Sequence, residues 1–196
     1  MTSENSRLRS LSTFSLALTV LLGGCSSVAP AGTSKFRLTS SNITSGARLD
    51  SKYEFQGFGC SGQGISPALS WSDPPEGTRS YAVTVYDPDA PTGSGWWHWV
   101  VVNIPASVNG LQGGAGKEGN VALPMGAEQV RNDFGAASWG GVCPPPGDSA
   151  HRYIFTVFAL KADRLDLPRN ATAALAGFMI NSQTIAKATV TATYAR

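Results

Sequence analysis

Charged side chains are scarce in this sequence. They make up 14% of its 196 residues, and 15 basic residues almost balance 13 acidic ones. A nucleic-acid-binding domain usually carries a concentrated basic face, so we expect no nucleic-acid partner. Apolar residues reach 42%, which is typical of a globular chain with a packed core, and the length fits one domain.

Signatures of the common enzyme classes are also missing. The sequence has no Walker A motif, no Gly-x-Ser-x-Gly elbow, and no alternation of strands and helices of the kind that carries a dinucleotide fingerprint. Its two histidines, His98 and His151, together with Cys143 and Asp87, are ligand types that zinc accepts, but no two of them are closely spaced. We therefore expect no metal, no cofactor and no catalytic residue.

No apolar run reaches the roughly 20 residues that a membrane-spanning helix needs. The N-terminal segment instead has Arg7 and Arg9, a short apolar run at 14–22, and then Gly23-Gly24-Cys25, which resembles a bacterial lipoprotein cleavage box. An ordinary signal peptide that ends near a cysteine is the alternative.

The lipoprotein interpretation divides the chain into three parts. We predict a signal peptide over residues 1–24, a flexible tether over 25–34 and a folded domain over 35–196. Cleavage before Cys25 and lipidation of its thiol would anchor the protein to a membrane surface of the cell envelope, outside the cytoplasm.

The rest of the sequence reads as strands and turns with one clear helix. Glycine (22 residues) and proline (12) are frequent, and they separate short segments rich in β-branched and aromatic residues. A helix is expected from 171 to about 186, with Asn170 as its N-cap. This pattern predicts a mainly β fold, an antiparallel sandwich or partial barrel. The expected strands lie at 36–38, 68–71, 81–86, 97–104, 152–160 and 189–194.

Polar side chains that could form a site follow or flank these strands. Asp87 and Asp89 lie in an Asp-Pro-Asp-Ala-Pro turn, where they either cap the strand or form a pocket wall. Strand alternation places His98 on the face opposite Trp97 and Trp99, from which its ring could donate to a phosphate or carboxylate oxygen.

Gly140 and Gly141 begin a Gly-Pro loop ahead of His151. Successive glycines can aim their backbone N–H groups at one point and form an anion nest, although a rigid surface turn has the same composition. Cys60 and Cys143 both lie in glycine-rich loops. Export makes a disulfide between them chemically feasible, and two separate thiols near one site are the alternative.

These motifs, in this order, resemble the phosphatidylethanolamine-binding protein family, also called Raf-kinase-inhibitor-like, and its bacterial branch in particular. The resemblance runs from about residue 36 to the C-terminus and rests on three segments of the chain. They are Asp87-Pro88-Asp89-Ala90-Pro91, the run from Pro91 to Trp99, and Asn132-Asp133-Phe134-Gly135 ahead of the Gly-Pro loop.

The resemblance implies a sandwich of two antiparallel sheets, one or two short helices, and a small anion-binding cavity at one end. Matching the family's site to this sequence implies a cavity formed by Asp87, His98 and His151, with Asp89 and Tyr153 beside them and backbone N–H groups of Gly140 and Gly141 as donors. Arg152, one residue after His151, is expected to point away from the cavity and pair with the Asp-Pro-Asp turn. Many bacterial members carry a histidine in the last helix, where this sequence has Gln183. Because glutamine can hydrogen-bond but cannot become cationic, this difference is expected to reduce the affinity for a dianion at low pH.

The function implied is non-enzymatic binding of a phosphate-like anion or a phospholipid headgroup. An inhibitor or interaction module for an envelope protein, such as a protease, is the main alternative. A hydrolase of phosphate or carboxylic esters, using the histidines and Asp87 for acid–base chemistry, is a minor one.

Overall fold

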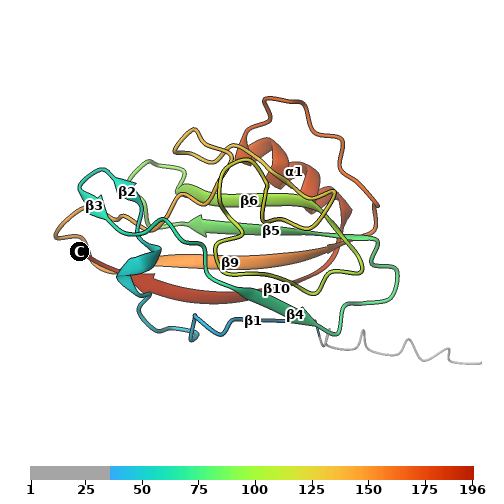
Figure 1. The fold of residues 1–196 in the computed structure, drawn as a ribbon, viewed down its shortest axis with the longest axis horizontal. Coiled ribbons are helices and arrows are strands. Elements are labelled where there is room, and N and C mark those ends of the chain that lie inside the picture. The colour runs from blue at the N-terminus through green and yellow to red at the C-terminus, as the bar shows by residue number, and fades with distance from the viewer. Residues whose placement is uncertain (1–35) are drawn as a thin grey trace, which may run out of the picture. The chain divides into compact units, whose positions relative to one another are not determined.

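Four long strands rich in β-branched and aromatic residues form the centre of the domain, in a computed structural model that describes residues 36–196. With one short strand they make a five-stranded antiparallel sheet (Figure 1). Its strands, in order across the sheet, are β10 Thr184–Tyr194, β9 His151–Leu160, β5 Ser80–Asp87, β6 Trp96–Pro105 and β8 Glu128–Gln129. The predicted signal peptide, Cys25 and the tether lie outside the described residues.

Two smaller sheets complete the β structure. A three-stranded sheet consists of β1 Arg37–Thr39, β4 Leu69–Ser72 and β7 Gly110–Leu111, and a two-stranded ribbon consists of β2 Gln56–Gly57 and β3 Cys60–Ser61. A 3-10 turn, η1, covers Ser51–Tyr53. The expected mainly β fold is therefore confirmed, with the ribbon as an addition to the two predicted sheets.

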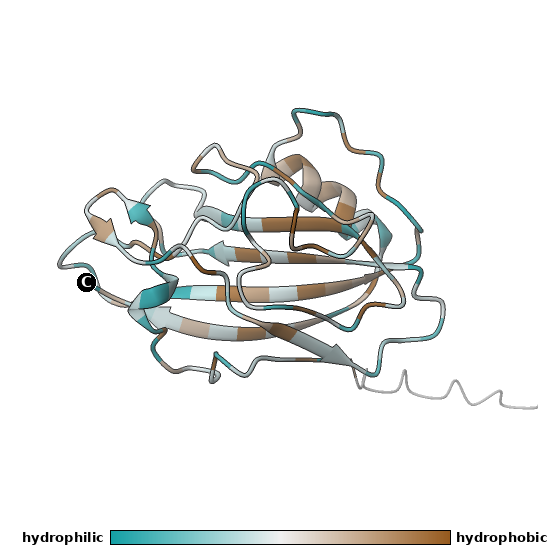
Figure 2. Ribbon diagram, in the orientation of Figure 1, coloured by the Kyte–Doolittle hydropathy of each residue, from teal (hydrophilic) through white to brown (hydrophobic). Residues whose placement is uncertain are grey.

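The two faces of the large sheet are buried against different partners. One face packs on the three-stranded sheet, and this inner core includes Val83, Phe155 and Trp71. The other face packs on helix α1, Ala173–Gln183, which contributes Ala176 and Ile180 to a second core. Figure 2 shows the hydrophobic segments along β6 and β9 that these layers cover. Each fully buried large apolar side chain stabilises the fold by about 1.5–3 kcal/mol.

The helix is shorter than the sequence predicts. It begins after Thr172, whose hydroxyl accepts a hydrogen bond from the Leu175 N–H at 3.2 Å, so Thr172 and not Asn170 is the N-cap. It ends at Gln183 because the chain then joins the sheet, where Thr184 pairs with Leu160. Within residues 36–196, no helix combines the length and apolar character needed to cross a bilayer.

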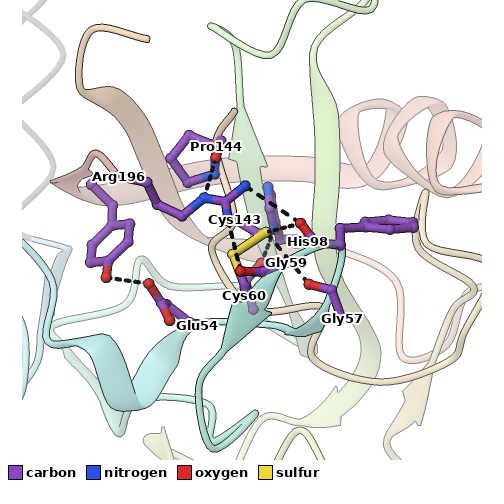
Figure 3. The surroundings of a disulfide bond; sticks show 11 residues. Glu54, Gly57, Gly59, Cys60, His98, Cys143, Pro144 and Arg196 are labelled. Carbon is purple, nitrogen blue, oxygen red and sulfur yellow. Dashed lines mark hydrogen bonds between the residues drawn. A yellow bond between two sulfur atoms is a disulfide. The ribbon is translucent and has the colours of Figure 1, made fainter. Parts of the chain in front are cut away.

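A disulfide joins Cys60 to Cys143, so the two cysteines are not separate thiols (Figure 3). It ties the β2–β3 ribbon to the Gly-Pro loop, across 83 residues of sequence. Arg196 supports the same junction, because its guanidinium donates to the carbonyls of Pro144 and Gly59 at 2.8 and 2.9 Å.

Replacing both cysteines, as Cys60→Ala with Cys143→Ala, is expected to lower the free energy of unfolding by about 2–4 kcal/mol, because the crosslink restricts a long loop in the unfolded chain. Denaturant unfolding of the full-length chain in a non-ionic detergent measures this. The control is the wild-type chain in reductant, which should lose the same amount. Equal midpoints for the variant and the oxidised wild type would contradict the prediction.

Candidate functional site

One acidic and one basic side chain meet at one end of the large sheet. Asp87 ends β5, and His151 begins the neighbouring strand β9. Each side chain lies on the inward-facing side of its strand. Asp87 shares that side with Val85, and His151 shares it with Phe155. Their side chains are almost fully buried, and His151 Nδ1 lies 2.8 Å from Asp87 Oδ2. An imidazole nitrogen this close to a carboxylate oxygen carries a hydrogen and donates it.

A β-bulge brings the third side chain, His98, to the same place. Val85 pairs with Trp99 but Tyr86 pairs with Trp97, so His98 is the extra residue of β6. The bulge turns His98 and Trp99 to the inner face, where both rings contact Trp139. Trp97 points to the opposite face, against the helix-side core. The expectation that His98 lies opposite Trp97 is right, but the same expectation for Trp99 is wrong, because simple alternation fails at a bulge.

The hydrogen bonding of His98 fixes its tautomer. Its Nδ1 lies 2.5 Å from the Gly141 carbonyl oxygen, which can only accept, so Nδ1 carries the hydrogen. Burial is the largest cause that lowers the pKa of His98, to about 4, and the neighbouring His151 lowers it further, while the Gly141 carbonyl opposes the shift. At neutral pH the ring is therefore uncharged, and Nε2 has a lone pair. Nε2 is buried and has no hydrogen-bond partner among the described residues.

The two oxygens of Asp87 have separate partners. Oδ1 accepts from the backbone N–H groups of Asp89 and Ala90, at 2.8 and 3.1 Å, and so closes the turn after β5. Oδ2 accepts from His151 and lies 4.0 Å from His98 Nε2. Asp87 therefore does both things that the sequence allows: one oxygen caps the turn after the strand, and the side chain forms part of the cavity wall.

Asp89 forms an ion pair with Arg152 and does not face the histidines. Its carboxylate accepts from the Arg152 side chain at 2.6 and 2.9 Å and from the Arg152 N–H at 2.8 Å. These hydrogen bonds lower the pKa of Asp89 to about 2. Arg152 points away from His151 and pairs with the Asp-Pro-Asp turn, as expected. Asp89 does not line the cavity described below; it holds the turn that positions Asp87.

The glycines of the Gly-Pro loop do not act as the predicted pair of N–H donors. The Gly140 N–H donates to the His98 carbonyl at 2.8 Å, so it is not available to a ligand. Gly141 contributes its carbonyl, which receives the His98 hydrogen. Its φ of +60° and its contact with Phe55, whose N would lie 2.2 Å from an added Cβ, require glycine at this position.

A cavity of about 170 Å³ opens over Asp87, His98 and His151. Most of its wall is apolar and comes from loops that follow or precede the strands. The remaining lining residues are Phe58, Ala90, Pro91, Thr92, Trp96, Phe134, Cys143, Pro144 and Pro145. Sequence reasoning did not anticipate Phe58, whose side chain is 74% exposed. It is held there by the disulfide-linked ribbon, a long-range constraint with no local sequence signal.

Tyr153 and Asp148 contact the histidines, but neither lines the cavity, although the sequence predicts Tyr153 as a ligand-binding residue. Tyr153 is fully buried, and its ring packs against His98 at 5.1 Å between centroids. Burial raises the pKa of Tyr153 and the Asp87 charge adds to the shift, so its hydroxyl keeps its hydrogen. Asp148 Oδ2 lies 3.4 Å from His151 Nε2, a contact that the sequence did not indicate. His151 therefore has a carboxylate at each ring nitrogen.

Gln183 lies far from this site. It precedes Thr184, which pairs with Leu160, whereas the cavity is at the other end of the strand pair, where Tyr194 faces His151. An extended strand of this length separates the two ends by roughly 30 Å. The expectation that Gln183 affects anion affinity is therefore wrong. Among residues 36–196, no cluster of three or more His, Cys, Asp or Glu side chains is arranged to hold a metal ion.

The ion pair with Arg152 predicts a pH signature for Asp89. Because the folded pKa lies below the value of about 3.9 expected in the unfolded chain, the carboxylate adds stability above that value and loses it as the pH falls toward 2. In Arg152→Met the Asp89 pKa should rise toward about 3.9, as measured by carboxyl ¹³C NMR titration. Arg37→Met, which breaks the exposed pair with Asp73, is the control and should leave Asp89 unchanged. An unaltered Asp89 titration in Arg152→Met would refute the assignment.

Comparisons with known proteins agree with this architecture. A family model described as phosphatidylethanolamine-binding protein matches residues 39–195. The UPF0098 protein YbcL of Escherichia coli K12 is 54% identical over 159 residues, covering 81% of this chain and 87% of YbcL. The crystal structure of YbcL matches with a TM-score of 0.81 at 53% identity, covering 82% of this chain and 98% of that chain.

Two further relatives extend the comparison. The UPF0098 protein YbhB of the same bacterium is 48% identical over 158 residues, covering 81% of this chain and 99% of YbhB. LppC of Mycobacterium tuberculosis, which bears a provisional lipoprotein name, is 32% identical over 178 residues, covering 83% of this chain and 84% of LppC. On the strength of the family model and these relatives, the chain belongs to the phosphatidylethanolamine-binding protein family.

Proposed function

We propose that the cavity binds a small phosphate-like anion or the headgroup of a phospholipid, without chemical turnover. The observation that carries the proposal is the ring of His98, a buried side chain that lines the cavity and has an unpartnered Nε2 within residues 36–196. A buried polar atom without a partner costs about 1–3 kcal/mol, and a ligand that hydrogen-bonds to it recovers that energy.

The size of the cavity supports a headgroup and not a whole lipid. Its volume of about 170 Å³ corresponds to about five or six water molecules at roughly 30 Å³ each. A phosphate group with a short substituent fits such a space, and acyl chains do not. The apolar wall lowers the local dielectric constant, which strengthens the few polar contacts that a ligand makes there.

The lining residues favour binding over hydrolysis. Among the described residues of the cavity wall, Thr92 carries the one hydroxyl, and that hydroxyl donates to the Gly95 carbonyl at 2.5 Å. The Cys143 sulfur is in the disulfide. Neither group is placed as a nucleophile next to the histidines, so we do not propose the esterase alternative.

An interaction with an envelope protein is a second candidate function. Phe58, 74% exposed, lies at the mouth of the cavity and stacks with Phe134 at 5.8 Å between ring centroids, which gives the rim an aromatic contact surface. Aromatic residues are frequent at the centres of protein interfaces.

The binding proposal predicts saturable titration of the full-length chain, in a non-ionic detergent, with phosphate, phosphoethanolamine or a short-chain phospholipid. His98→Ala and His151→Ala should each weaken binding about tenfold or more, since the first removes the Nε2 contact to the ligand and the second removes the hydrogen bond that holds Asp87 in the cavity. Isothermal calorimetry measures both.

Trp97→Phe is the matched control, because Trp97 is one residue from His98 on the same strand but faces the opposite core. It should bind as the wild type does. Unchanged affinity in both histidine variants would exclude this site, and a folded chain that binds none of the three ligands would favour the protein-partner function.

We further propose that the protein is an exported lipoprotein anchored through Cys25. The cleavage-box sequence and the similarity to LppC support this. Cys25→Ser is expected to move the protein from the membrane fraction to the soluble fraction of the envelope, as followed by fractionation and immunoblotting, because one lost lipid anchor removes the membrane attachment. Continued membrane association of the variant would contradict the anchor.

A further inference from the structure

The outer face of helix α1 is apolar where a surface helix is usually charged. The helix contains no charged residue, and its inward row is buried against the large sheet. The residues on its exposed side, called here the α1 outer face, are Ala174, Leu175, Phe178 and Ser182. Phe178 is 69% exposed. Because a helix normally turns polar side chains to water, this face is suited to contact with an apolar medium.

Two unpaired arginines border the start of the helix. Arg131 and Arg169 line a hollow of about 390 Å³ beside α1. Arg131 also lines the adjoining hollow of about 280 Å³, together with Thr172 and Ala173 at the helix start. Neither guanidinium has an ion pair or a hydrogen bond within residues 36–196. Both charges are therefore available to an anionic surface.

Two lysines lie toward the other end of the helix. The Lys161 N–H donates to the carbonyl of Gln183, the last residue of α1, at 2.9 Å. Lys187 is the β10 partner of Phe158, whose side chain belongs to the helix-side core, so Lys187 lies on the same side of the sheet as the helix. In the part of the chain that the structure describes, neither ammonium group has an ion pair. The apolar outer face is thus flanked by positive charge at both ends.

The carboxylates near these cations are mostly neutralised by other basic residues. Asp133 contributes one negative charge at the smaller hollow. The others form ion pairs, which are Glu128 and Asp166 with Arg164, and Asp163 with Arg79. The region around the α1 outer face therefore keeps an excess of positive charge.

We infer that the α1 outer face lies against an anionic lipid surface, the surface of the membrane that carries the anchor. This inference rests on the proposed lipidation of Cys25. Apolar side chains of an interfacial helix enter the boundary between headgroups and acyl chains, and basic side chains beside it contact anionic headgroups. Phe178 and Leu175 supply the first kind of contact, and Arg131 and Arg169 supply the second.

The predicted tether is long enough for this orientation. The described domain begins at Phe36, whose ring centroid lies 6.2 Å from that of Tyr81 on the inner side of the large sheet. The packed sheets and the helix layer are each about 10 Å thick, so the α1 outer face lies roughly 20 Å from Phe36. The ten residues between Cys25 and Phe36 can span at most about 35 Å.

The anchor makes so small a surface sufficient. A few basic and apolar side chains do not hold a free protein on a membrane, because stable attachment takes a lipid chain combined with a second signal. Once the domain is anchored, docking becomes an intramolecular step at a high effective concentration of lipid. Loss of the anchor in Cys25→Ser should therefore still release the protein.

Spin labels on the full-length chain, reconstituted through its anchor into vesicles, test the inference. Cys25 carries the lipid and the other two cysteines form the disulfide, so an introduced cysteine is the free thiol to label. Ser182→Cys reports on the α1 outer face, and Ser70→Cys, at an exposed position of β4, is the matched control. In vesicles of phosphatidylcholine mixed with phosphatidylglycerol, the label at 182 should be shielded from a water-soluble paramagnetic reagent. The label at 70 should stay accessible, and in phosphatidylcholine alone both should.

Charge and apolar variants of the labelled chain measure the two contributions. Arg131→Gln with Arg169→Gln should lower the ratio of shielded to accessible label about 25-fold, since each arginine near an anionic surface contributes roughly fivefold. Phe178→Ser should lower it about tenfold. Arg37→Gln with Lys52→Gln is the control, because it removes the same charge from β1 and η1, which pack on the inner side of the large sheet. It should leave the ratio unchanged.

The outcomes separate this inference from the proposed anchor. A chain that floats with the vesicles but leaves both labels equally accessible would overturn the inference and leave lipidation in place. A chain that does not float with them would overturn both. Equal shielding at 182 in neutral and in mixed vesicles would exclude recognition of anionic lipid. Dipolar coupling between labels at 182 on two chains would place a second copy on this face, and it would overturn the inference as well.

Discussion

The hydrogen bond from His98 Nδ1 to the Gly141 carbonyl is the contact on which the site depends. It joins the bulged end of β6 to the Gly-Pro loop, and the loop returns the contact through the Gly140 N–H, which donates to the His98 carbonyl at 2.8 Å. Asn132 donates to the same carbonyl at 3.3 Å. The loop, the bulge and the imidazole are thus held together by one small network. The same bond that positions the ring also decides which of its nitrogens faces a ligand.

Asp87 couples the fold to the site in a similar way. Oδ1 closes the turn after β5, and that turn is also held by the ion pair between Asp89 and Arg152. Oδ2 faces the two histidines. Removing the whole carboxylate would therefore loosen the turn and change the cavity at once, so loss of binding in such a variant would not by itself reveal a ligand contact. Substitutions that retain one oxygen separate the two roles.

The sequence predicted the site best where the strands are regular. β9 keeps an unbroken period of two, so alternation placed His151 inward and Arg152 outward. Alternation gives the wrong face for one residue of β6, because a bulge inserts an extra residue without changing the local composition. As a result Trp99 lies on the same face as His98. The loop glycines were recognised as special, but whether a glycine offers its N–H or its carbonyl depends on its backbone angles, which spacing does not reveal.

Longer-range features were harder to predict from the sequence. The Cys60–Cys143 disulfide spans 83 residues, and the position of Phe58 on the cavity rim follows from it. The hydrogen-bond roles of the histidines could not be predicted from the sequence for a related reason. Residue types alone suggest a cavity with two histidines that donate to an anion. In the structure the Gly141 carbonyl sets the donor and acceptor roles of the His98 ring, and the carboxylates of Asp87 and Asp148 already face the nitrogens of His151. In a buried polar site, the groups that fix the tautomer therefore determine ligand chemistry as much as the side chains that line the cavity.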